Sequence, residues 1–281
     1  MHSRIFDYFD PVIFTIFGWP VKWYGLAYVV GILLGVMLLK RNTAKFSKLC
    51  PDLKLKKSFY DDLLIYSIIG IILGGRIGYM IFYSPHSFLH DPADILKVPQ
   101  GGMSFHGGLL GVLFSCMLLA NKHKIHTLLL GDMISVIAPV GIFFGRIANF
   151  INAELKGRLT NVSWGVIFPD DYGRLRHPSQ LYEAFFEGIL LYFIMYYFLR
   201  FLVNNADNKN HPYKPGIISG IFLLFYSFCR CNLEYFREPD RHLGIVGFGL
   251  TMGQILSILM FVFGAILIYV KINAKIRSKI R

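Results

Sequence analysis

The sequence predicts an all-α membrane protein with seven transmembrane helices, on the strength of its apolar content, its block pattern and its charge distribution. Of the 281 residues, 54% are apolar and 16% aromatic, and the mean hydropathy is +0.50. An ordinary globular chain is about 45–50% apolar. The apolar residues fall into blocks long enough to cross a bilayer, with short polar segments between them. We therefore expect residues 1–281 to form a single polytopic membrane domain.

The blocks that predict transmembrane helices share an apolar run of about the length that a bilayer core requires. They lie at about 23–39, 62–83, 104–120, 131–151, 180–200, 216–236 and 245–270. The third block is short, and paired glycines stand at its beginning.

The net charge of +12 is divided unequally between the two sets of alternating connecting segments. Lys and Arg number 17 in segments 40–61, 121–126, 200–215 and 271–281, against 9 in segments 1–22, 84–103, 152–179 and 237–244. The positive-inside rule then places the C-terminus in the cytoplasm, and the N-terminus and a small periplasmic loop region outside. The basic excess is thus a signal of topology, and we expect no nucleic-acid partner.

The four cysteines do not have the spacing of a zinc or redox site. Cys229 and Cys231 are separated by one residue, where common pairs have two. We interpret the cysteines as small apolar side chains and expect neither a metal nor a cofactor.

Three arginines lie inside the predicted spans: Arg76, Arg146 and Arg230. Each stands 14 or 15 residues from the cytoplasmic start of its span, or about 21–23 Å into a core of about 30 Å. Separate snorkelling to the outer headgroups is one explanation. A shared inward-facing cluster is the other, and planar, always charged guanidinium groups would suit the phosphate of an anionic headgroup.

Polar residues accompany these arginines at helical spacing, which favours the cluster. Arg146 and Asn149 are three residues apart, and Tyr226, Arg230 and Glu234 are separated by four. His106 lies between glycines where a span begins, in GGMSFHGG. It has the ordinary pKa of a proton acceptor near neutral pH, although a structural or exposed histidine is the alternative.

The residues alone leave two rival functions to consider, a transporter and an intramembrane protease. A transporter of organic anions would also place arginines and a histidine in a bundle, but its site would lie nearer the bilayer midplane. An intramembrane protease is disfavoured because the chain has no H-E-x-x-H motif.

The segment GRIANFINAELKG (145–157) resembles the signature of the prolipoprotein diacylglyceryl transferase family at every defined position. The other stretches that agree with the family are WYGL (23–26), GGMSFHGG (101–108), HPSQLYE (177–183), and Arg230 and Glu234 followed by REPD (237–240). Two departures are small: Lys22 and Ser163 stand where the family commonly has Arg and Pro.

The resemblance implies a multi-pass enzyme of the bacterial inner membrane with its active site toward the periplasm. It would move the diacylglyceryl group of phosphatidylglycerol to the lipobox cysteine of a prolipoprotein and release glycerol phosphate. Both partners would be substrates that reach the site from the bilayer. The product is a thioether, and this is the first step of lipoprotein maturation.

Chemical roles for the candidate residues follow from that reaction. Arg146 and Arg230 would stabilise the departing phosphate, and Glu234 would orient Arg230. His106 or a tyrosine would take the thiol proton. The expected substrate-binding set is Arg146, Asn149, Asn152, Glu154, Gly157, Tyr24, Tyr226 and Arg76.

Overall fold

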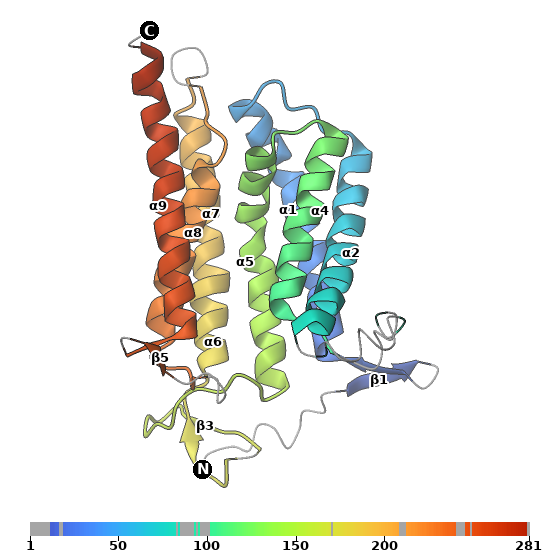
Figure 1. Ribbon diagram of the computed structural model, residues 1–281, viewed down its shortest axis with the longest axis vertical. Helices are drawn as coiled ribbons and strands as arrows, with labels where there is room; N and C mark the ends of the chain where they lie inside the picture. The colour runs from blue at the N-terminus through green and yellow to red at the C-terminus, as the bar shows by residue number, and fades with distance from the viewer. Residues whose placement is uncertain are drawn as a thin grey trace. The chain divides into compact units, whose positions relative to one another are not determined.

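A computed structural model describes residues 12–16, 19–82, 84, 93, 95, 102–169, 171–207, 212–239, 245–247 and 249–279. Its helices (Figure 1) are α1 (Trp23–Leu49), α2 (Lys57–Phe82), α4 (Phe105–His123), α5 (Thr127–Ile151), α6 (Ser179–Glu183), α7 (Leu191–Asn204), α8 (Ile217–Leu233) and α9 (Met252–Lys279). A π-helix, η4 (Ala184–Leu190), joins α6 to α7 without a break. Three antiparallel hairpins are formed by β1 (Val12–Ile16) with β2 (Trp19–Lys22), β3 (Val166–Ile167) with β4 (Leu175–Arg176), and β5 (Ile245–Gly247) with β6 (Leu250–Thr251).

Five of these helical segments are long and apolar enough to cross a membrane: Trp23–Leu49, Lys57–Ile81, Thr127–Ile151, Ser179–Asn204 and Met252–Asn273. Helix α8 is apolar as well but shorter, with 17 residues. The prediction of an all-helical, multi-pass membrane protein is confirmed. The count of seven spans and the orientation of the termini stay predictions.

The last predicted span begins later in the structure than the apolar pattern suggested. Residues 245–247 and 250–251 pair as β5 and β6, and α9 starts only at Met252. Gly249, between the two strands, has φ +73°, which a helix does not accept. The apolar pattern could not locate this turn because the residues on both sides of it are also hydrophobic.

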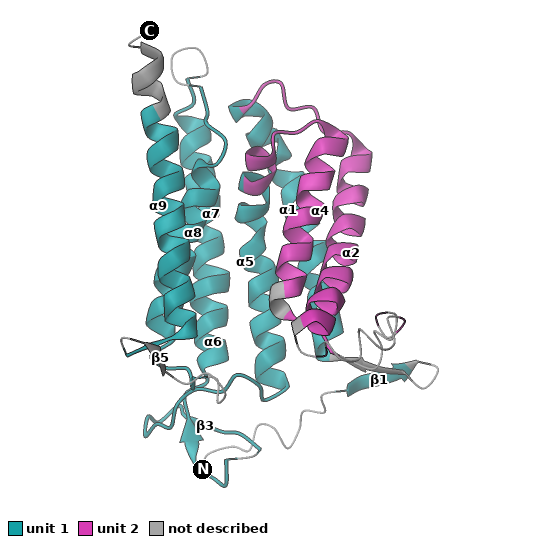
Figure 2. Cartoon of the chain, viewed as in Figure 1, with its two compact units in different colours: residues 1–49, 132–281 teal, residues 50–131 magenta. Residues whose placement is uncertain are grey.

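The chain divides into two compact units (Figure 2), of which Cys50–Gly131 is the smaller. Within this unit α2 and α4 pack through glycines on both helices. A Cβ on Gly78 would lie 2.7 Å from the Cα of Gly107, and a Cβ on Gly74 equally close to the Cα of Gly111. The glycines around His106 thus let two helix backbones approach each other closely. The second unit, residues 1–49 and 132–281, contains most of the predicted site.

A buried carboxylate fixes the start of α8 in the larger unit. Asp132 of α5 accepts hydrogen bonds from the backbone N–H groups of Gly216 (2.5 Å) and Ser219 (2.7 Å). It also accepts from the hydroxyls of Ser219 (2.7 Å) and Tyr213 (2.6 Å). A carboxylate is favourable at this end, where free N–H groups carry partial positive charge. Helix α8, which packs along α9 (Figure 1), is thereby fixed at the end opposite Arg230.

Candidate functional site

The signature segment covers the end of α5 and a constrained turn after it. Arg146 and Asn149 lie in the last two turns of the helix. Ala153 and Leu155 adopt left-handed conformations with φ +55° and +54°, which is rare for residues with a side chain. The backbone N–H of Glu154 donates to the carbonyl of Asn149 at 2.9 Å. The turn that holds Glu154 therefore contains backbone strain at Ala153 and Leu155, as is often found at functional sites.

Tyr24, at the start of α1, forms hydrogen bonds with the residues on either side of this turn, Asn149 and Glu154. Its hydroxyl donates to Oε2 of Glu154 at 2.5 Å and accepts a hydrogen bond from Nδ2 of Asn149. Tyr28 follows one turn later, with its ring stacked 6.3 Å from that of Tyr24. The predicted residues Tyr24, Asn149 and Glu154 therefore form one hydrogen-bonded group beside Arg146.

A fully buried carboxylate, that of Glu183, bridges the two intramembrane arginines of this unit. Its Oε2 lies 3.0 Å from Nη1 of Arg146, and its Oε1 accepts from Nη1 of Arg230 at 2.9 Å. Arg237 approaches the same Oε1 at 3.8 Å. Of the three arginines expected to share a cluster, Arg146 and Arg230 share Glu183, whereas Arg76 belongs to the smaller unit.

Two further carboxylates complete this charge cluster. Glu187 accepts from Nη2 of Arg146 at 3.2 Å, and Glu234 lies 2.7 Å from Nη2 of Arg230. The Arg230–Glu234 contact is the i,i+4 pair that the spacing indicated. We call the set Arg146, Arg230, Arg237, Glu183, Glu187 and Glu234 the charge cluster. Its formal charge is zero, because three guanidinium groups face three carboxylates.

The π-helix accounts for the placement of two of these carboxylates. Glu183 ends α6 and Glu187 lies within η4, and both side chains are fully buried against Arg146. Such π-helical turns are rare and are frequently found at functional sites. Next to them Gly188 lies so close to α5 that a Cβ would stand 2.7 Å from the Cβ of Phe143.

Glu234 is also held from α9. The hydroxyl of Thr251 donates to its Oε1 at 3.0 Å. A Cβ on Gly253 would lie 2.7 Å from that same oxygen, so only a glycine leaves room for the carboxylate. The β6–α9 junction therefore sets the orientation of Glu234, and through it that of Arg230.

Gly157 is the last residue of the signature. It contacts HPSQLYE (177–183) on one side and REPD (237–240) on the other. Its N–H donates to the carbonyl of His177 at 3.1 Å, and it forms a β-bridge with Arg237. A Cβ there would lie 2.8 Å from the carbonyl oxygen of Phe236 and would also overlap His177. Burial lowers the pKa of the His177 imidazole, which favours its neutral form at pH 7.

Arg176 of β4, which directly precedes HPSQLYE, forms hydrogen bonds with both the signature and the REPD motif. Its Nε donates to Oδ1 of Asp171 at 2.7 Å, and its Nη1 donates to the carbonyl of Gly157 (2.9 Å) and to Glu238 (2.8 Å). Glu238 belongs to the REPD motif, so that motif has a structural role in supporting the signature turn.

Several buried side-chain oxygens of the larger unit accept no hydrogen bond from any residue that the structure describes. They are Oδ1 of Asn152, Oε1 of Gln180, Oε1 of Glu187 and Oγ of Ser227. Buried acceptors without donors are costly and rare in proteins. They are suited to a ligand that brings hydroxyl or thiol donors.

The remaining predicted residues divide between the two units. Tyr226 stacks on Phe222 at 5.7 Å, one turn before Arg230. Arg76 belongs to the smaller unit, where its guanidinium donates to the carbonyls of Ile95 (3.3 Å) and Gly102 (3.2 Å). His106 is the second residue of α4, whose N-cap is Ser104, but its side chain lies outside the described residues.

Comparison with known proteins gives the family. The model of prolipoprotein diacylglyceryl transferases matches residues 11–270. A phosphatidylglycerol–prolipoprotein diacylglyceryl transferase of Rickettsia bellii (strain OSU 85-389) is 46% identical over 273 residues, 97% of this chain and 98% of that protein. Its namesake in Rickettsia felis is 47% identical over 264 residues, covering 94% and 97%. The chain belongs to the prolipoprotein diacylglyceryl transferase family.

Glu183, Glu187 and Gln180 of this family member were not among the predicted site residues, although Glu183 stands in HPSQLYE. A signal was available. Both glutamates lie four residues apart inside an apolar span, and an unpaired charge there is costly. Arg146 and Arg230, which lie in other spans, therefore indicated that these carboxylates would meet them.

Proposed function

We propose that this chain transfers the diacylglyceryl group of phosphatidylglycerol to the lipobox cysteine of prolipoproteins, the first step of lipoprotein maturation. Its family membership and the paired arginines on Glu183 support the proposal. The cysteine sulfur forms a bond to the glycerol carbon, and the carbon–oxygen bond to phosphate breaks. The electron pair leaves with glycerol phosphate, and the thiol proton passes to a base.

Arg146 and Arg230 stabilise the charge that grows on the departing phosphate. Both side chains are only 16% and 11% exposed, so water screens them little. Glu183 and Glu234 hold the two guanidinium groups in place before the lipid arrives, and this preorganisation avoids a rearrangement during the reaction. The carboxylates are positioning residues in this scheme.

The headgroup glycerol occupies the polar side of the site. It has hydroxyl donors, and Asn152, Gln180 and Glu187 present buried oxygens without a donor among the described residues. Tyr24, Asn149 and Glu154 border the same space and fix the headgroup by hydrogen bonds. Arg76 and Tyr226 remain in the proposed binding set.

His106 takes the thiol proton. A free cysteine has a pKa of about 8.5, so a base is needed to form thiolate at neutral pH. The start of α4 gives His106 a fixed backbone position.

The proposal takes residues 1–281 as one polytopic domain of the bacterial inner membrane with seven spans. The N-terminus lies outside, the C-terminus lies in the cytoplasm, and the site opens toward the periplasm. The 17-to-9 division of basic residues supports this orientation.

The test is an assay with purified chain, phosphatidylglycerol and a lipobox peptide. A thioether-linked diacylglyceryl peptide and free glycerol phosphate are expected in equal amounts. A peptide with serine in place of cysteine should give no product. Absence of product with the cysteine peptide, from a folded chain, would refute the proposal.

A further inference from the structure

A polar cavity lies between α1 and α7, toward the end of α1 that is farthest from Tyr24. Its volume is about 300 Å³, and its polar lining is Arg41, Asn42 and Lys45 from α1 with Tyr192 and Tyr196 from α7. Arg41 follows Tyr24 by 17 residues, or about 26 Å along the helix axis. The cavity therefore lies at the opposite end of α1 from the proposed active site.

The cavity has positive charge that no described carboxylate neutralises. Nζ of Lys45 donates to Oδ1 of the buried Asn42 at 2.7 Å and lies 4.9 Å from the ring centroid of Tyr196. The guanidinium of Arg200 lies 6.0 Å from the same centroid. Within the described part of the chain, no Asp or Glu pairs with Arg41, Lys45 or Arg200, in contrast to the arginines of the charge cluster.

This arrangement is suited to an anion. Asn42 and the Tyr196 ring fix the Lys45 ammonium at the cavity wall, so its charge is in place before a ligand binds. Arg41 adds a planar group that can bind phosphate oxygens in pairs. The shared chemistry of the ligand is a phosphate group, either free or on a lipid.

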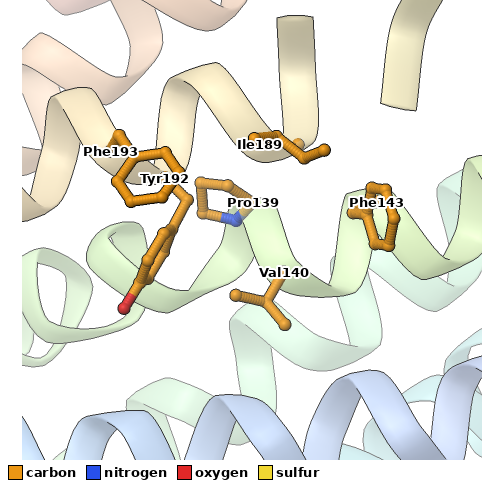
Figure 3. Close-up of a pocket in the computed structure, with 7 residues that line it drawn as sticks. Pro139, Val140, Phe143, Ile189, Tyr192 and Phe193 are labelled. Atoms are coloured by element: carbon orange, nitrogen blue, oxygen red, sulfur yellow. The ribbon is translucent and has the colours of Figure 1, made fainter. Parts of the chain in front are cut away.

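An adjoining apolar cavity favours the lipid. It is lined by Pro139, Val140 and Phe143 of α5 and by Gly188, Ile189, Tyr192 and Phe193 of η4 and α7 (Figure 3), with a volume of about 150 Å³. Tyr192 and Phe193 line both cavities. In Figure 3 the hydroxyl of Tyr192 points away from Ile189 and Phe193. Phosphate at one end and hydrocarbon next to it is the order of groups in a phospholipid.

We propose that these two cavities hold one anionic phospholipid, in addition to any lipid at the active site. Its phosphate binds between Arg41 and Lys45, and part of an acyl chain lies against Phe193, Pro139 and Phe143. The bound lipid links α1 to α7 and to α5, with its phosphate toward the end of α1 that is farthest from Tyr24. This lipid site does not depend on the proposed reaction.

Native mass spectrometry of the full chain in detergent, titrated with phosphatidylglycerol, tests this site. The double variant Arg41→Gln/Lys45→Gln should retain one lipid fewer than the unaltered chain. Removing two basic side chains from the surroundings of an anionic headgroup corresponds to about 30-fold weaker binding. The matched control Lys40→Gln/Lys48→Gln removes the same charge from the same end of α1, outside the cavity lining, and should retain the lipid.

Further measurements test whether the bound phosphate belongs to a lipid or is free, and whether the lipid lies in these two cavities. Phosphatidylcholine should not replace phosphatidylglycerol, and inorganic phosphate at millimolar concentration should not displace it. Val140→Trp, which fills the apolar cavity, should weaken lipid retention. Arg146→Lys should leave this lipid bound, so the result is independent of activity. Equal numbers of bound lipids for the cavity and control variants, or displacement by inorganic phosphate alone, would overturn the proposal.

Discussion

Replacing Glu183 with glutamine isolates the contribution of the buried carboxylate between two arginines. The side chain is fully buried, and its oxygens lie 3.0 Å and 2.9 Å from the guanidinium groups of Arg146 and Arg230. Removing one partner of a buried ion pair costs about 3–5 kcal/mol. The two arginines keep 16% and 11% exposure, which places the expected loss near the lower limit, about 3 kcal/mol. At about 2–4 °C for each kcal/mol, Tm should fall by about 6–12 °C.

The assay is thermal unfolding of the purified chain in detergent, with Glu238→Gln as the matched control. Glu238 also pairs with an arginine, Arg176, at 2.8 Å, but its side chain is 39% exposed. Exposed pairs contribute about 0–1 kcal/mol, so Tm should change by less than about 4 °C. Equal decreases in Tm for the two variants would show that burial at Glu183 does not set the strength of its ion pairs. Turnover of Glu183→Gln, measured well below its Tm, should fall as well because both guanidinium groups lose a shared anchor.

Four other outcomes follow from the site. Arg146→Lys should lose nearly all transfer, since an ammonium cannot meet two carboxylates and a phosphate together; near-normal turnover would mean that charge alone suffices. His106→Gln should lower turnover about 10²–10⁴-fold at pH 7 and recover in part as the pH approaches the thiol pKa, whereas a constant deficit from pH 6 to 9 would exclude the general base. Gly157→Ala should lower Tm and turnover together, because its Cβ overlaps backbone atoms of two segments; an unchanged Tm would contradict this packing. Reporter fusions after Ala120 and Arg281 should both report cytoplasm, and a periplasmic signal at either would reverse the topology.

Contacts within one helix were predictable from spacing. The separation of Arg230 and Glu234 indicated a shared face, and the structure gives an ion pair of 2.7 Å. The block pattern likewise located the long apolar helices, because bilayer thickness fixes their length. Both predictions depend on regularities that a single stretch of sequence already contains.

Contacts between helices were not predictable in this way. Glu183 meets Arg146 of α5 and Arg230 of α8. These arginines lie 37 residues before and 47 residues after Glu183, in other helices, and no spacing rule predicts such contacts. The π-helix adds a local change of register that periodicity does not report. The glycines beside His106 show the same limit: the sequence places them at the start of a span, but it does not identify the α2 backbone as the group that they contact.

The neutral charge cluster explains how its three arginines are stable beside apolar helices. Each guanidinium has a carboxylate within 4 Å, so none is an isolated charge in a low-dielectric region. The same neutrality reduces the long-range attraction for an anionic headgroup, and recognition must then depend on short-range geometry. A phosphate that reaches Arg146 and Arg230 meets guanidinium groups already fixed by the glutamates of the cluster, so it gains oriented hydrogen bonds and loses little to rearrangement. On the proposed function, Glu183 and Glu187, which helical spacing alone did not indicate, set the direction in which the arginines act.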